Sequence, residues 1–203
     1  MPSLISTTPI RLIVGLGNPG NEYEDTRHNA GFWYADTIAK HLGTSFARDA
    51  KFFGATAKTK YKGNDVFLVK PGTYMNRSGQ SVQALANFFK ITPAEMLVLH
   101  DELDLMPGIV KMKLGGGTGG HNGLKDIQAK IASPDYWRVK IGIGHPRTLN
   151  LTQEVADFVL HAPRRDDRVL IESNQSKLID ILPLLLEGNF EEALRLFHTK
   201  PKA

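Results

Sequence analysis

The 203-residue chain contains no cysteine, and this absence removes a whole class of chemistry. A chain without thiols has no cysteine nucleophile and no thiolate-bound metal site. It forms no disulfide either, which mildly favours an intracellular compartment. The chain also lacks any run of about eighteen apolar residues, so we expect no membrane-spanning helix.

The amino-terminal stretch MPSLISTTPIRLIVGLG lacks a basic region followed by a long apolar run. We therefore expect no secretory signal and a cytoplasmic protein. The composition is 41% hydrophobic, enough for one sizeable core, and we expect a single domain over residues 1–203. The net charge of +4 is compatible with a nucleic-acid partner, but an ordinary enzyme also fits it.

Hydrophobic periodicity predicts strands that alternate with helices. The expected strands lie at 10–14, 52–61, 66–69, 96–99, 109–114 and 137–143. The expected helices lie at 30–42, 79–89, about 123–132, 164–186 and 190–198, with Ser78 as an N-cap and Gly43 as a C-cap. This order predicts an α/β fold with a mixed, twisted β-sheet flanked by helices.

Almost every residue with a side chain suited to catalysis or binding lies in a loop that follows an expected strand. These loops follow Val14, Val69, Leu99 and Leu114. Ligands of such sheets gather beyond the carboxyl ends of strands, so we expect one site there.

A glycine pattern at 15–20 raises the alternative of a dinucleotide-binding oxidoreductase, because it matches G-x-G-x-x-G after a strand. That motif needs a helix that begins at its last glycine and holds a pyrophosphate. Here the expected helix starts about ten residues later. Three carboxylates, Glu22, Glu24 and Asp25, occupy the place of the phosphates. The sequence therefore disfavours a nucleotide site.

His28 and Asp101 are the candidates for acid–base chemistry. A loop histidine is mostly unprotonated near neutral pH and can act as a base. A carboxylate at a strand end can orient an imidazole and stabilise its charged form. Taken singly, His28 could equally be a surface residue and Asp101 a turn or cap. His100 and Asp101 should point to opposite faces, which disfavours joint metal ligation.

Asparagine recurs in three of the strand-end loops, at Asn18, Asn76 and Asn122. An amide can bind a peptide backbone, hold a water or stabilise an oxyanion, although Asn also favours turns for local reasons. The chain has no G-x-S-x-G elbow and no H-E-x-x-H motif. This leaves an enzyme that activates water directly, and we expect neither a metal nor a cofactor.

Basic residues alternate along two expected strands. Lys111 and Lys113 share one face, as do Arg138 and Lys140. Beside the glycine-rich loop at 115–120 they predict a phosphate-binding face, although a solvated face would have the same pattern.

Taken together, these loops resemble the bacterial-type peptidyl-tRNA hydrolase family. The similar stretches are GLGNPGNEYEDTRHNAGF at 15–32, KPGTYMNRSGQSV at 70–82, HDELDLMPGIVKMKLGGGTGGHNGLKDI at 100–127 and RVKIGIGHP at 138–146. They span most of the chain in the right order, which is more specific than any single motif.

The resemblance implies hydrolysis of the ester between a peptide and the terminal ribose of tRNA. It implies that His28 is the catalytic base, Asp101 its orienting carboxylate, and Asn122 a neighbour of the attacking water. It implies that Asn18 separates N-blocked from free aminoacyl-tRNA. It also implies substrate contacts for Tyr23, Tyr74, Met75, Asn76, Asn122 and His121, and tRNA-phosphate contacts for Lys113 and Lys140.

Two positions depart from the family pattern. The pattern favours arginine at position 140 and often histidine at position 118, where this chain has Lys140 and Thr118. Lys140 keeps the charge but loses bidentate phosphate geometry, and Thr118 also affects RNA binding rather than catalysis. Some relatives of this fold bind RNA without hydrolysis, so a non-catalytic tRNA-binding protein is the alternative. Because His28 and Asp101 are both present, the enzyme is favoured, and the resemblance implies a monomer.

Overall fold

A computed structural model describes residues 6–200 of the chain. Seven strands form one sheet in the order β2-β3-β4-β1-β5-β7-β6. The four central strands run parallel to one another: β4 (Asn64–Pro71), β1 (Leu12–Gly15), β5 (Met96–Glu102) and β7 (Trp137–Gly142). The antiparallel strands lie toward the edges: β2 (Ala47–Asp49), β3 (Gly54–Tyr61) and β6 (Val110–Leu114).

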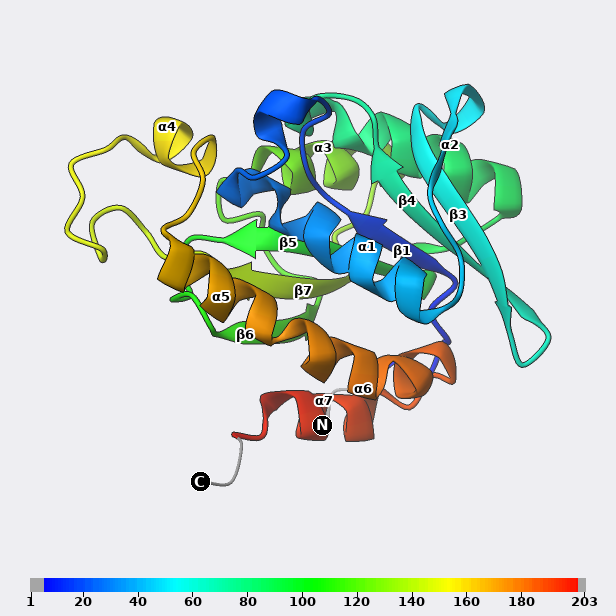
Figure 1. Ribbon diagram of the computed structural model, residues 1–203. Helices are drawn as coiled ribbons and strands as arrows, with labels where there is room; N and C mark the ends of the chain where they lie inside the picture. Colours follow the sequence, from blue (N-terminus) through cyan, green and yellow to red (C-terminus); the bar gives the residue numbers. More distant parts are fainter. Residues whose placement is uncertain (1–5, 201–203) are drawn as a thin grey trace.

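Helices cover both faces of this sheet (Figure 1). One face packs against α1 (Ala30–His41), α5 (Arg165–Ser173), α6 (Gln175–Leu186) and α7 (Phe190–His198). The other face packs against α2 (Ser78–Phe89) and α3 (Asn122–Ile131). All four residues of β1 are buried, because a central parallel strand needs apolar side chains on both faces. The expected α/β class with a mixed sheet is confirmed.

The glycine pattern is explained by the close approach of α1 to the strands. A Cβ atom on Gly31 would lie 2.3 Å from the carbonyl oxygen of Leu99, so only glycine fits there. This contact fixes the start of α1, and the short helix η2 (Arg27–Asn29) before it, at the carboxyl edge of β5. Since α1 begins at Ala30, ten residues after Gly20, the glycine loop does not open a phosphate-binding helix.

The expected single helix over 164–186 was wrong, because Asn174 divides it into α5 and α6. The backbone of Asn174 departs from helical geometry (φ −89°, ψ 0°), and its side-chain amide donates to the carbonyl of Gly108 at 2.8 Å. Strand β2 and helix α4 (Val155–Val159) were not predicted, since three and five residues are too short for a periodic signal. No helix within residues 6–200 has the length and apolarity needed to span a membrane.

Two local expectations are corrected. The loop after Leu114 does not start at the shared carboxyl edge, because β6 is antiparallel to β7 and Leu114 pairs with Trp137 at its start. The glycine-rich segment has to run back across the sheet to bring His121 to the site. Ser78 does not cap α2; its hydroxyl donates to Met75, and Asp126 accepts from the Gly79 amide at 2.7 Å.

Candidate active site

Three segments of the chain bring two histidines onto one carboxylate. His28 lies in η2, Asp101 near the end of β5, and His121 is the N-cap of α3. Nδ1 of His28 lies 3.0 and 2.9 Å from the two Asp101 oxygens, and Nε2 of His121 lies 2.8 Å from Oδ1. Asp101 is 4% exposed, so both imidazoles bond to a carboxylate shielded from water.

The surroundings of His121 determine its tautomer. Its Nδ1 accepts hydrogen bonds from the backbone amides of Gly123 and Leu124, at 3.1 and 3.3 Å. A nitrogen that accepts carries no proton, so Nε2 of the neutral ring carries it and donates to Asp101. His28 likewise donates from Nδ1 to the carboxylate, which leaves its Nε2 unprotonated. Within residues 6–200 that atom has no hydrogen-bond partner, and it is available as a base.

The electrostatics favour a strong base at His28. Burial alone would lower its pKa, but the charge of Asp101 and the hydrogen bond to it outweigh burial, so the pKa lies above its usual value. For Asp101, burial alone would raise the pKa, but the two histidines more than offset this and hold it far below the usual range. The carboxylate therefore stays ionised throughout the pH range in which His28 titrates.

The same three residues have a donor set that a metal ion could use, since their ligand atoms all lie within 4.8 Å of one another. The tautomer of His121 opposes this use. Metal ligation by Nε2 would place the ring proton on Nδ1, where it would face the two amide N–H groups of Gly123 and Leu124. We therefore interpret the cluster as a hydrogen-bonded relay.

Asn18 joins the loops that follow β1 and β4. Asn29 holds its backbone through two hydrogen bonds, at 2.8 and 3.0 Å, and its Oδ1 accepts from the Met75 amide at 2.7 Å. Oδ1 of Asn18 is thus already engaged by the protein, whereas its Nδ2 donor has no hydrogen-bond partner within residues 6–200.

A cavity of about 470 Å³ opens beside His28, with Asp101, Thr118, His121, Asn122 and Val155 among its lining residues. Asn122 is the first residue of α3 and Asn76 lies in η4 (Met75–Arg77); both are exposed. In the part of the chain that the structure describes, neither side-chain amide has a hydrogen-bond partner. Met75 is 4% exposed, whereas Tyr74 is 61% exposed and packs edge-on against Tyr23, with ring centroids 6.3 Å apart.

Two buried arginines shape this site, and no pattern in the sequence predicted their burial. Arg27 donates to the carbonyls of Phe158 and His161 and lies 3.8 Å from the centre of the Phe158 ring. It thus ties α4, a wall of the cavity, to the residue beside the base. Arg138 does not contribute to a phosphate-binding face as expected: it is fully buried, and its guanidinium donates to the carbonyls of Gly116, Gly117 and Pro134.

The remaining basic residues lie as the alternation predicted. Lys111 pairs with Lys140 and Lys113 with Arg138 across β6 and β7, so all four share one face. Lys111 and Lys113 are exposed and Lys140 is half-buried. With Arg138 buried, the three lysines are the cations of this face that a ligand can reach.

Fold and site together define an α/β protein with a candidate general-base centre, in which a buried carboxylate is hydrogen-bonded to an imidazole at a cavity. The family model of peptidyl-tRNA hydrolase matches residues 12–203. The chain belongs to the peptidyl-tRNA hydrolase family, which confirms the resemblance seen in the sequence motifs.

Individual relatives agree over nearly the whole chain. A peptidyl-tRNA hydrolase of Bordetella avium is 60% identical over 191 residues, 94% of this chain and 92% of that protein. One from Polynucleobacter asymbioticus is 54% identical over 193 residues, 94% of this chain and 98% of that protein. The crystal structure of peptidyl-tRNA hydrolase from Acinetobacter baumannii superposes with a TM-score of 0.88 at 42% identity, and the match covers 97% of each chain.

Proposed function

We propose that the protein hydrolyses the ester that joins a peptide to the terminal ribose of tRNA. The observation that carries this proposal is the unbonded Nε2 of His28, which lies in a cavity and is backed by a buried carboxylate. The names of the Bordetella and Polynucleobacter relatives support the substrate. A tRNA- or RNA-binding protein without catalysis has no use for a base held in this way.

In the proposed reaction His28 takes a proton from a water molecule through Nε2. The water oxygen forms a bond to the ester carbonyl carbon, and Asp101 stabilises the resulting imidazolium. When the tetrahedral intermediate collapses, the bond from carbon to the ribose oxygen breaks and His28 returns its proton to that oxygen. An alcohol is a better leaving group than an amine, so one base and a few oriented amides suffice.

The free amides of Asn76 and Asn122 are our candidates for the groups that bind the ester and its oxyanion. An oxyanion donor contributes about 10²–10³-fold to the rate. Tyr23, Tyr74 and Met75 would line the path of the peptide or of the tRNA end. We assign His121 a positioning role, because both of its ring nitrogens are already bonded within the protein.

The experiment that tests the function is the release of peptide from N-acetyl-aminoacyl-tRNA by the purified protein. We expect multiple turnovers without added metal or cofactor. Binding of the substrate without release would favour the non-catalytic tRNA-binding alternative. We further propose that one domain over residues 1–203 acts as a monomer in the cytoplasm.

Replacing Asn18 with aspartate should reduce the preference for N-blocked over free aminoacyl-tRNA. One carboxylate oxygen can still accept from Met75, while the other replaces the Nδ2 donor that faces the ligand. A negative charge there attracts the free α-ammonium and repels the carbonyl of a peptide. The ratio of kcat/KM values for the two substrates measures the effect, and an unchanged ratio would contradict this role.

Replacing Lys113 and Lys140 together with alanine should raise KM for full-length peptidyl-tRNA and leave kcat unchanged. The two ammonium groups would neutralise phosphates, an interaction equally strong in the ground and transition states. The slope of log KM against log salt should become shallower by about 0.7–0.9 per lysine.

Two controls separate this role from a structural one. A peptide ester of adenosine has no acceptor stem, so its hydrolysis should be unaffected by the double replacement. Lys58 and Lys60, which lie on β3 and pair with Asp65, are the matched control, and their double replacement should change neither substrate. Equal losses on both substrates in the Lys113 and Lys140 variant would show that those lysines support the fold.

A further inference from the structure

A groove of about 650 Å³ lies beside the Asn18 loop, apart from the cavity at His28. Its floor and walls are formed largely by Pro19, Phe32, Phe53, Gly72 and Thr73, and we call it the Phe53 groove. Arg48 and Lys70 lie at its rim. Its volume is typical of ligand pockets, and no step of the proposed hydrolysis uses it.

The position of the groove follows from the bond between Asn18 and Met75. This bond joins the two loops at 2.7 Å. Pro19, the next residue on one loop, and Thr73, two residues before Met75 on the other, both line the groove. The groove is therefore next to Asn18 along both loops, and a peptide whose last residue lies at Asn18 can extend toward it.

The groove presents an exposed aromatic ring. Phe53 is 43% exposed and follows the short helix η3 (Ala50–Phe52), which it closes at φ +53° in the left-handed region typical of helix ends. An exposed ring in a groove of this size matches the apolar side chains of an extended peptide.

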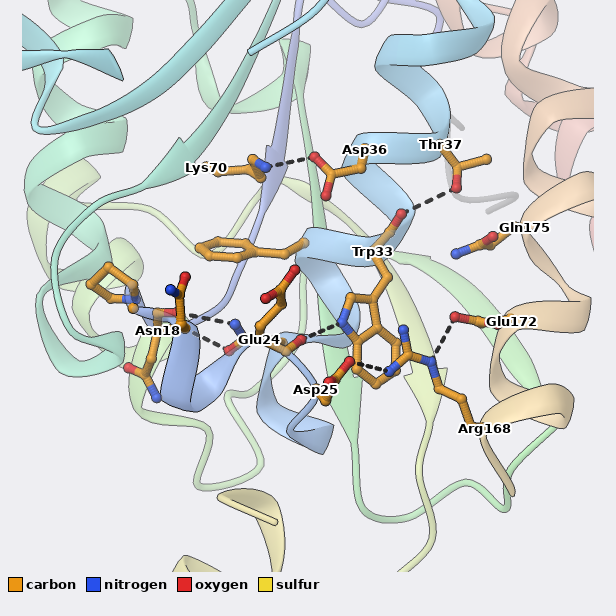
Figure 2. Close-up of a pocket in the computed structure, with 15 residues that line it drawn as sticks. Asn18, Glu24, Asp25, Trp33, Asp36, Thr37, Lys70, Arg168, Glu172 and Gln175 are labelled. Carbon is orange, nitrogen blue, oxygen red and sulfur yellow. Dashed lines mark hydrogen bonds and ion pairs between the residues drawn. The ribbon is translucent and has the colours of Figure 1, made fainter. Parts of the chain in front are cut away.

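The neighbouring pocket, which Figure 2 shows, fits such a ligand less well. It shares Pro19, Phe32 and Lys70 with the groove. Four of its charged groups are bonded in pairs: Lys70 with Asp36, and Arg168 with Glu172, both at 2.6 Å. Arg168 also lies 3.4 Å from the centre of the Trp33 ring and covers that apolar surface. The apolar surface left uncovered beside Asn18 is therefore in the Phe53 groove.

We propose that the Phe53 groove is a subsite for the peptide residues that precede the one esterified to tRNA. The inference rests on the proposed function and names a further part of its substrate. Apolar side chains of the peptide would pack on Phe53 and Phe32. Arg48 lines the groove and has no ion-pair partner within residues 6–200, so the peptide residue that lies beside it should be acidic rather than basic.

The test compares two substrates on the same tRNA, N-acetyl-Phe-tRNA and N-acetyl-Leu-Leu-Phe-tRNA. Replacing Phe53 with asparagine removes the ring and keeps a residue that tolerates positive φ. We expect kcat/KM for the three-residue peptide to fall about five- to tenfold, through KM, while the one-residue substrate is unaffected. Phe88→Ala is the matched control, because Phe88 is an aromatic residue 55% exposed outside the groove, and it should change neither substrate.

A second variant tests the charge of the rim and does not depend on the fold around Phe53. With Arg48→Glu, the preference for N-acetyl-Glu-Leu-Phe-tRNA over N-acetyl-Lys-Leu-Phe-tRNA should reverse. Equal losses on short and long peptides in Phe53→Asn, or an unchanged charge preference in Arg48→Glu, would overturn the subsite and leave the proposed function standing. Failure of the unaltered protein to hydrolyse any of these substrates would overturn both.

Discussion

Replacing His28 with alanine should lower kcat by about 10²–10⁴-fold, while the affinity for peptidyl-tRNA and the thermal midpoint stay nearly unchanged. The base at Nε2 is lost, and among residues 6–200 the other two histidines near the cavity cannot replace it. Both nitrogens of His121 are bonded within the protein. His100 is fully buried, which lowers its pKa to about 3.

Single-turnover cleavage and equilibrium binding of N-acetyl-aminoacyl-tRNA measure the two quantities separately. His41→Ala is the matched control, since His41 is exposed at the end of α1, far from any role in the proposed reaction. A His28→Ala protein that kept more than about a tenth of the rate would remove His28 from its assigned role.

The fold could be predicted from the sequence wherever periodicity was strong. The central strands and the helices α1, α2, α3 and α7 follow hydrophobic patterns that reflect burial on one or both faces. The break at Asn174 was not predicted, because the residue's hydrogen bond to Gly108 joins positions 66 residues apart and leaves no local signal in the sequence. The direction of β6 was equally hidden, since an alternating pattern is the same in parallel and antiparallel strands.

The site was predictable as a set of residues and not as a mechanism. Motif resemblance singled out His28, Asp101, Asn18 and His121, but sequence alone did not show which atoms are already bonded. The engaged Oδ1 of Asn18 and both engaged nitrogens of His121 depend on backbone amides of other loops. Arg138 appeared among the basic residues of a strand face, and only its burial under the glycine loop shows that it is structural.

Replacing Asp101 with asparagine should lower kcat by about 10²–10⁴-fold without unfolding the protein. The carboxylate accepts from two histidines at once, and an amide has only one oxygen. Because the cap on α3 fixes the proton of His121 on Nε2, the amide oxygen must face His121. The amide NH₂ then takes the place of Oδ2, 2.9 Å from Nδ1 of His28, while the single oxygen at the Oδ1 position, 3.0 Å from the same nitrogen, is shared with His121. This favours the tautomer of His28 in which Nε2 carries the proton and cannot act as a base.

The pH profile of the same variant provides an independent measurement. In the unaltered protein kcat/KM should rise with pH as His28 loses its proton, with a midpoint above the ordinary histidine pKa, because Asp101 raises the pKa of His28. Without the carboxylate only the effect of burial remains, and burial lowers this pKa. The midpoint should therefore move to lower pH in Asp101→Asn, while the plateau falls. An unchanged midpoint and plateau would show that Asp101 is structural.

A second replacement should partly restore the activity of Asp101→Asn, if the tautomer of His28 is the cause of the loss. His121→Asn keeps a residue that can cap the N-terminus of α3. It removes the Nε2–H donor to which the side-chain amide oxygen at position 101 is hydrogen-bonded in Asp101→Asn. The amide at position 101 can then turn its oxygen to Nδ1 of His28 and restore the productive tautomer. A hydrogen bond of this kind contributes about 1–2 kcal/mol, so the double variant should exceed Asp101→Asn by about tenfold in kcat. His121→Asn alone should cost activity, because it removes a donor to Asp101. If the two losses multiply in the double variant, the shared carboxylate does not act by setting the tautomer of His28.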